Sequence, residues 1–263
     1  MTIGLSILAA VLYAIATWRL ARALNRQDTV GGPLTLSLAA IALALHAVVV
    51  IGNTGWPENL SLPFFTALAA AAVGVVLLQL ILSLQHSAHY LGLLIYPIAA
   101  ITLLLSHTAG RNAVISDAAI QVHVLLSLMA YSVFTVAAAQ AILVAVQRHF
   151  LSEHKPGGFM RALPPLEAAE GLLFALLGVG LVFLTLSLAS GFFYLEDMFA
   201  QHLVHKTVLS CLAWIIFAML LFGRWKFGWR GRRAVHWTFG GFAMLILAYF
   251  GSKFVLELLL ERG

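Results

Sequence analysis

The sequence predicts an all-α, polytopic membrane protein with eight transmembrane helices. Hydrophobic residues make up 62% of the chain and charged residues 10%, whereas soluble domains carry roughly 25% charge. Apolar stretches recur at a length of about 17 to 25 residues, which spans a bilayer as a helix. The strand-like alternation of a membrane barrel is absent. The expected spans are residues 3–23, 34–52, 63–84, 90–106, 119–146, 171–193, 204–222 and 235–259.

The first span resembles a signal peptide only superficially. Its apolar part is long, and its basic residues Arg19, Arg22 and Arg26 follow it rather than precede it. A signal peptide has a shorter apolar part with the basic residues in front. We therefore expect a retained helix.

The later spans follow one another closely. The longest connection runs over residues 147–170, so we expect a single transmembrane domain over residues 1–263. Pro164 and Pro165 precede the sixth span, with Glu167 and Glu170 just after them, a pattern typical of a helix start. The one cysteine, Cys211, lies inside a span, so no internal disulfide is expected.

The basic residues predict the orientation in the membrane. Eleven of the 15 Lys and Arg residues follow spans 1, 5 and 7. Such residues stay on the cytoplasmic side, so we expect an inner-membrane protein with both termini extracytoplasmic. The net charge of +5 is then a topology signal, and no nucleic-acid partner is expected.

The sequence lacks the residues that are typical of several classes of membrane protein and enzyme. The centres of the spans carry no Asp or Glu, although such residues usually mark the proton or ion path of a transporter. No phosphate-binding glycine loop, zinc-protease histidine pair or hydrolase nucleophile motif is found. We predict no catalytic residues and no enzymatic activity. The histidines remain as the candidate functional residues.

Histidines gather on the expected extracytoplasmic side. His123 begins the fifth span, and His202 and His205 lie at the start of the seventh, beside Lys206. Imidazole is a common metal ligand, and two imidazoles from different helices can hold both axial positions of a haem. His86 and His89, expected on the cytoplasmic side, form a competing pair of equal merit.

Each of the two outer histidines, His123 and His205, shares a helix face with other residues of its own span. His123 shares a face with Ser127 and Tyr131, and His205 shares one with Leu209 and Leu212. An apolar wall with a polar rim suits a flat apolar cofactor. Interfacial histidine is also compatible with simple solvation, so spacing alone leaves both readings open.

The second half of the chain resembles the cytochrome c assembly superfamily of haem-handling membrane proteins, in particular a small inner-membrane branch. The resemblance is strongest over residues 118–256. It is carried by four segments: QVHVLLSLMAYSVFTVAAAQAILV (121–144), LPPLEAAEGLLFALLGVGLVFLTLSLASGFF (163–193), HKTVLSCLAWIIFAMLLFGRWKFGWRGRRA (205–234) and GFAMLILAYFGSKFV (241–255). The resemblance implies haem handling at the outer face, with His123 at the position of an iron ligand in haem-delivering members.

The chain also departs from the superfamily pattern. The family's tryptophan-rich outer segment, followed by Pro-Lys-Glu-Thr, is replaced by FAQHLVHKTVLS (199–210), in which Lys206 and Thr207 keep part of the pattern. A family histidine near the inner end of span 7 falls on Phe222, and the outer histidine after span 8 has no counterpart in FVLELLLERG (254–263). We therefore expect His123 and His205 to ligate haem iron, with His202 as a lesser candidate.

Two alternatives stay open. One is a regulatory or scaffolding protein that holds another membrane protein through its helices or basic loop. The other is a divalent-metal accessory protein that uses the same histidines without a porphyrin.

Overall fold

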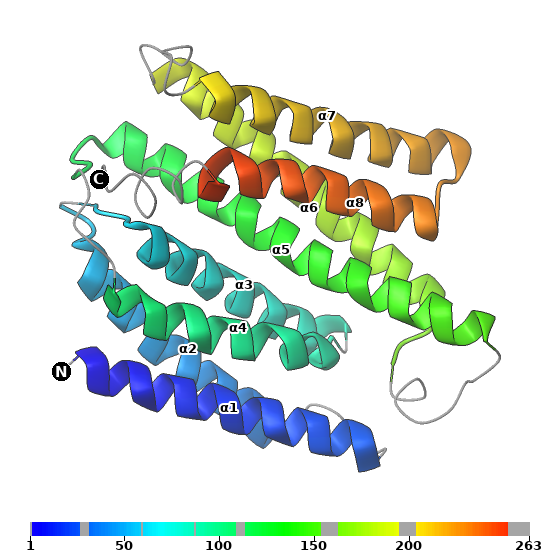
Figure 1. Ribbon diagram of the computed structural model, residues 1–263, viewed down its shortest axis with the longest axis horizontal. Helices are drawn as coiled ribbons and strands as arrows, with labels where there is room; N and C mark the ends of the chain where they lie inside the picture. The colour runs from blue at the N-terminus through cyan, green and yellow to red at the C-terminus, as the bar shows by residue number, and fades with distance from the viewer. Residues whose placement is uncertain are drawn as a thin grey trace. The chain divides into compact units, whose positions relative to one another are not determined.

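The computed structural model confirms the predicted fold class. It describes residues 2–26, 32–58, 60–86, 88–108, 114–153, 163–194 and 204–251, and these contain eight helices long and apolar enough to cross a membrane (Figure 1). The helices are α1 (Thr2–Arg26), α2 (Pro33–Thr54), α3 (Phe64–His86), α4 (Gly92–Leu105), α5 (Ala118–Ser152), α6 (Leu166–Tyr194), α7 (Val204–Phe227) and α8 (Arg232–Ile246). Short 3-10 segments, η1 (His89–Leu91) and η2 (Ser106–Thr108), flank α4, and a π-helical turn, η4 (Leu247–Gly251), extends α8.

Two helices are longer than their apolar stretches. α5 continues to Ser152 and α6 begins at Leu166, five residues before the expected start. Polar residues at these ends extend the helices beyond the apolar length, because backbone hydrogen bonding does not stop where the lipid does. The expected eighth span ends outside the described residues.

The helices form two compact units. Unit 1 comprises residues 1–112 and 146–166, and unit 2 comprises residues 113–145 and 167–263. A single transmembrane domain over the whole chain stays a prediction.

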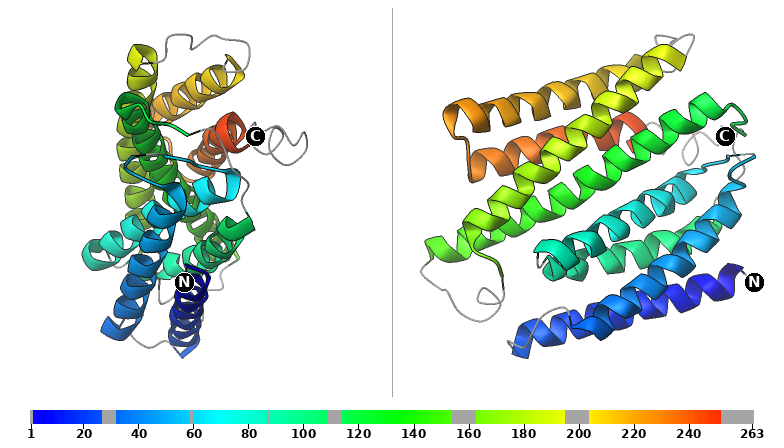
Figure 2. Two further views of the ribbon diagram at one scale, coloured as in Figure 1. Left: turned by 90° about the vertical axis from the view of Figure 1, so that its left-hand side faces the viewer. Right: turned by 180° about the vertical axis from the view of Figure 1, so that it is seen from behind.

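Unit 1 contains a closed ring of four helices. α1 packs against α2 and α4, and α3 packs against the same two helices (Figures 1 and 2). Consecutive helices run in opposite directions, as short connections require.

Polar and aromatic side chains fill the centre of unit 1. The Tyr13 hydroxyl lies 3.4 Å from Nδ1 of His46, and the Tyr13 ring stacks on Tyr96 with a centroid distance of 5.8 Å. His46 is fully buried. At one end of the ring, the Ser6 hydroxyl lies 2.7 Å from Nε2 of His107. Two further histidines of the sequence are therefore held by side chains of α1.

A stacked pair of phenylalanines lies at the centre of unit 2. The rings of Phe134 on α5 and Phe217 on α7 are nearly parallel, with centroids 4.0 Å apart. A Cβ on Gly180 of α6 would lie 2.8 Å from the Phe134 ring, and one on Gly241 of α8 would lie 2.6 Å from the Phe217 ring. All four helices of the unit therefore contribute to this layer, two with a ring and two with a glycine that makes room for it.

A buried carboxylate ties α6 to the start of α8. Glu170 accepts a hydrogen bond of 3.1 Å from the backbone N–H of Gly231, which precedes the first turn of α8 and has a positive φ of 61°. Acidic groups stabilise helix N-termini because they face the positive end of the helix dipole. Glu167 occupies the first turn of α6, as its sequence position suggests, whereas Glu170 acts on a neighbouring helix.

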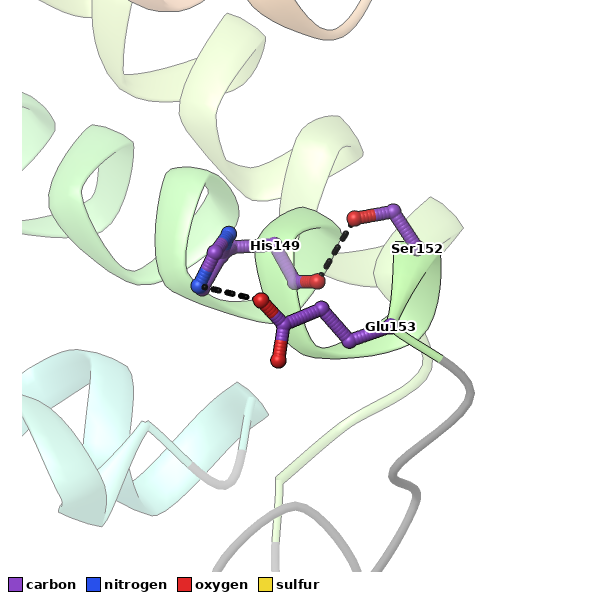
Figure 3. A network of polar contacts seen from close by, with 3 residues as sticks. All are labelled: His149, Ser152 and Glu153. Carbon is purple, nitrogen blue, oxygen red and sulfur yellow. Dashed lines mark hydrogen bonds and ion pairs between the residues drawn. The ribbon is translucent and has the colours of Figure 1, made fainter.

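The end of α5 is polar and exposed. Nε2 of His149 lies 3.3 Å from Oε1 of Glu153, and the Ser152 hydroxyl donates to the carbonyl of His149 (Figure 3). The His149 side chain is 66% exposed, so this contact contributes little to stability.

The glycine beside Phe217 generates a stability prediction. Gly241→Val would force the Phe217 ring out of its stack, and overpacking of this kind costs about 1–3 kcal/mol. Gly240→Val is the matched control, because nothing lies within 4 Å of a Cβ at the neighbouring position. Thermal unfolding in detergent should show a lower midpoint for Gly241→Val only. Equal midpoints for the two variants would show that the layer tolerates the added volume.

Candidate functional site

A cavity of about 140 Å³ opens among the helices of unit 2. It lies at the end of the unit where α5 and α7 begin and α6 ends (Figure 1). Its walls are mostly apolar and include Ala130, Leu184, Leu188 and Ala248. Polar side chains of α5, α6 and α7 project into the remaining part.

His123 supplies the imidazole of this cavity. It lies in the second turn of α5 and is half-buried. Its Nδ1 is 3.0 Å from the carbonyl oxygen of Ser187 and 3.0 Å from the hydroxyl oxygen of Ser190, both on α6. The ring is therefore fixed by backbone and side-chain atoms of a neighbouring helix.

The hydrogen-bond network assigns the imidazole tautomer. The Ser190 hydroxyl donates its one hydrogen to the Ser187 carbonyl at 2.8 Å, so its oxygen can only accept from His123. The Ser187 carbonyl also can only accept. Both partners therefore require the proton on Nδ1, which leaves Nε2 of the neutral ring with its lone pair. Nε2 makes no hydrogen bond with any of the described residues.

A second pair of hydroxyls extends the network. Ser127 donates to the carbonyl of His123 at 2.8 Å, so in its 2.7 Å contact with Ser187 it must accept. The donor directions are thus determined from Ser187 through Ser127 to the backbone of His123. Buried polar networks with every direction satisfied hold their members in one arrangement.

The α7 wall of the cavity carries a cation and two hydroxyls. Lys206, Thr207 and Ser210 line the cavity, and Lys206 is the only charged side chain among its described lining residues. Positions 206 and 210 are four residues apart and share a face of the helix. This wall therefore brings an ammonium group and two hydroxyl groups to the cavity.

The end of α8 closes the cavity with a π-helical turn. Leu245, Ala248 and Tyr249 line the cavity, and the Tyr131 hydroxyl donates to the carbonyl of Leu245 at 2.9 Å. Single π-turns inside α-helices occur frequently at functional sites. Here the turn sets which side chains of the eighth span reach the cavity.

The three histidines predicted as ligands lie in different surroundings. His123 lines the cavity, whereas His205 is exposed on α7 and is absent from the lining. His202 lies outside the described residues. The structure thus brings His123 together with Lys206 rather than with its neighbour His205.

Several residues of the site carry no motif that sequence reasoning could use. Ser187 and Ser190 are ordinary serines of a transmembrane helix, and only the spacing of positions 206 and 210 points to a shared face. Among the described residues, no three His, Cys, Asp or Glu side chains come together as a metal site. His89 of the competing inner pair is described, but the side chain of His86 is not.

The residues present fit haem as ligands, and the cavity size limits how much of it enters. An unprotonated imidazole nitrogen whose other nitrogen donates to a backbone carbonyl is the usual form of a metal-bound histidine. Sites that enclose small molecules measure roughly 300–1,000 Å³, so a cavity of about 140 Å³ does not enclose a whole porphyrin, and a haem bound there would lie partly outside it.

Comparisons with known proteins agree with the resemblance of the second half and extend it. A family model described as "Cytochrome C assembly protein" matches residues 2–260. "Inner membrane protein YpjD" of Escherichia coli is 31% identical over 97% of this chain and 98% of its own length. "Cytochrome c biogenesis protein CcsA" of Guillardia theta is 21% identical over 81% of this chain and 80% of its own length. No solved structure matches the chain.

The match of the family model covers almost the whole chain, including the first four spans, which lie outside the region where the sequence resemblance is strongest. The YpjD relative and the eight apolar helices place it in the inner membrane as a multi-pass protein. The chain belongs to the cytochrome c assembly protein family.

Proposed function

We propose that this protein binds haem at the cavity of unit 2 and handles it at the extracytoplasmic leaflet in cytochrome c biogenesis. His123 is the iron ligand, through Nε2. Haem is the cargo of this site, and the protein supplies the ligand, the apolar contacts and the hydrogen bonds that orient the ring.

The assigned tautomer of His123 carries the proposal. Nδ1 donates to atoms of Ser187 and Ser190, so Nε2 is the available nitrogen. A carbonyl that accepts from the far nitrogen raises the basicity of the ligating one and fixes the plane of the ring. The leucines and alanines around the imidazole give contacts suited to the apolar face of a porphyrin.

The family supports the same direction of inference. One relative is named a cytochrome c biogenesis protein, and haem attachment is the chemistry that such biogenesis serves. The extracytoplasmic side follows from the basic residues after spans 1, 5 and 7. The cavity end of unit 2 is the opposite end from the basic turn between α7 and α8.

His205 is the second axial ligand candidate in this proposal. Because it is exposed beside Lys206, it reaches an iron only if the porphyrin extends beyond the cavity along α7. His202 precedes it by three residues and is the remaining candidate. The proposal therefore separates a first ligand inside the cavity from a second one at its rim.

One prediction of the proposed function concerns His123 and His205. His123→Ala should abolish the Soret band of protein purified from haem-replete cells, because it removes the ligand inside the cavity. His205→Ala should shift the band or weaken it without abolishing it, since it removes only a rim ligand. His236→Ala on α8 is the control and should leave the absorbance spectrum unchanged, because Nδ1 of its exposed ring contacts, among the described residues, only the Arg232 carbonyl of its own helix.

Three outcomes would contradict the proposal. If haem-free protein shows no Soret shift when haem is added, the proposal fails. Stoichiometric zinc or copper without porphyrin would favour the metal accessory function. A membrane partner that co-purifies equally with wild type and His123→Ala, in haem-free form, would favour the scaffolding function.

A second prediction tests the tautomer. Ser190→Ala removes one acceptor of the Nδ1 proton and the donor to the Ser187 carbonyl. Loss of such an outer partner typically lowers metal affinity about 10–100-fold, so we expect haem affinity to fall by that factor with little loss of folding stability. The measurement is a haem titration followed at the Soret maximum.

Thr135→Val is the matched control for this titration. In the part of the chain that the structure describes, its hydroxyl bonds only to the carbonyl of Tyr131 within the same helix, so haem affinity should stay unchanged. Equal affinities for Ser190→Ala and wild type would show that the serine does not position the imidazole.

A further inference from the structure

We propose that the turn between α7 and α8 binds the phosphate of an anionic phospholipid at the headgroup level of the membrane. The exposed basic side chains of this turn, the turn cations, are Lys226, Arg230, Arg232 and Arg233. The turn lies at the end of unit 2 opposite the cavity, so the proposal does not depend on haem binding.

The charge of the turn is not compensated by acidic residues. Residues 204–251 contain six Lys and Arg residues but no Asp or Glu. In the part of the chain that the structure describes, none of the turn cations forms an ion pair. The carboxylate of Glu170 lies beside the turn, but it is buried and accepts a hydrogen bond from the backbone N–H of Gly231. The turn therefore presents an excess of positive charge to its surroundings.

The backbone of the turn is held in one arrangement. The N–H of Gly228, which has a positive φ of 65°, donates to the carbonyl of Arg224 at 3.1 Å, and the N–H of Trp229 donates to the carbonyl of Gly223 at 3.2 Å. Hydrogen bonds of this kind close the end of a helix. The Trp229 ring packs on Gly223, where a Cβ would collide with it, and the Arg233 guanidinium lies 6.0 Å from the ring centroid. Cations held on a fixed turn lose less freedom on binding a ligand than cations on a flexible loop.

Three exposed aromatic rings at the end of α7 favour a lipid over an acidic protein segment. The side chains of Phe222, Trp225 and Phe227 are 53%, 82% and 66% exposed. The centroids of the Trp225 and Phe227 rings lie 6.1 Å and 6.2 Å from that of Phe222. An acidic protein segment would meet the turn cations but leave these rings without a partner, whereas a phospholipid carries a phosphate and acyl chains on one molecule.

The length of α7 puts the rings and the turn cations at the right depth. From Val204 to Arg224 the helix rises about 30 Å, which is roughly the thickness of the hydrocarbon core. Aromatic rings at this depth lie at the membrane interface, and basic residues just beyond it meet lipid phosphates. Three of the four turn cations are arginines, whose planar guanidinium can bind two phosphate oxygens at once.

The experiment measures lipid binding to the full-length protein by native mass spectrometry. Protein in a neutral detergent is titrated with phosphatidylglycerol and with phosphatidylcholine of the same acyl chains. Wild type should bind phosphatidylglycerol at least tenfold more tightly than phosphatidylcholine. Arg230→Gln/Arg232→Gln should lower the affinity for phosphatidylglycerol about tenfold or more, because it removes two cations from the anionic headgroup. Arg230→Lys/Arg232→Lys keeps both charges and should retain most of the preference.

Arg22→Gln/Arg26→Gln is the matched control, because it removes two exposed arginines at the end of α1. It should keep the tenfold preference for phosphatidylglycerol. An equal loss in the two glutamine variants would show that the overall charge of the protein attracts the lipid, and the proposal would fail. Unchanged binding in Arg230→Gln/Arg232→Gln would also overturn it.

Two further measurements identify the source of the phosphate. Glycerophosphoglycerol, the headgroup without acyl chains, should not displace phosphatidylglycerol at a hundredfold higher concentration, because it cannot contact the rings. Displacement at equal concentration would assign the turn to free phosphate compounds and contradict a lipid site. Equal affinity of wild type for the two lipids, together with Arg230-dependent binding of a polyglutamate peptide, would assign the turn to an acidic protein and overturn the proposal.

Discussion

The stack of Phe134 on Phe217 is the contact on which unit 2 depends. The two aromatic rings, with centroids 4.0 Å apart, fix how α5 and α7 are aligned along their lengths. Gly180 and Gly241 let α6 and α8 approach the same layer, because any Cβ at these positions would meet a ring. Without a hydrophobic driving force between helices in lipid, close packing of this kind is what holds a bundle together.

This layer also determines which side chains face the cavity. His123 precedes Phe134 by 11 residues and Lys206 precedes Phe217 by 11 residues, while Gly191 follows Gly180 by the same number. Eleven residues make about three turns and a rise of about 16 Å. Each cavity residue therefore lies on nearly the same helix face as the member of the layer on its own helix. The core contact and the candidate site belong to one continuous set of packed faces.

The sequence was sufficient to predict eight helices, because each apolar stretch is long enough to cross the bilayer. Of the candidate ligands that it named, His123 lines the cavity, His205 does not, and His202 lies outside the described residues. The sequence could not distinguish Lys206 from His205, because neighbouring positions on a helix differ by about 100° and α7 is apolar on most sides. Only the packing of Phe217 shows which of the two faces inward. The sequence also could not identify Ser187 and Ser190, which hold the imidazole, because their roles depend on the register between α5 and α6.

The surrounding lipid explains why the polar groups of the cavity are hydrogen-bonded. Unsatisfied hydrogen-bonding groups are costly in a bilayer, so Ser127, Ser187 and Ser190 bond to one another and to nearby backbone carbonyls. The imidazole nitrogen left over by this network is the exception, and it faces a volume too small to surround a porphyrin. A ligand larger than this cavity keeps part of its surface in contact with lipid or with a partner. In the function proposed above, a partly enclosed haem is easier to pass on to another protein than a fully enclosed one.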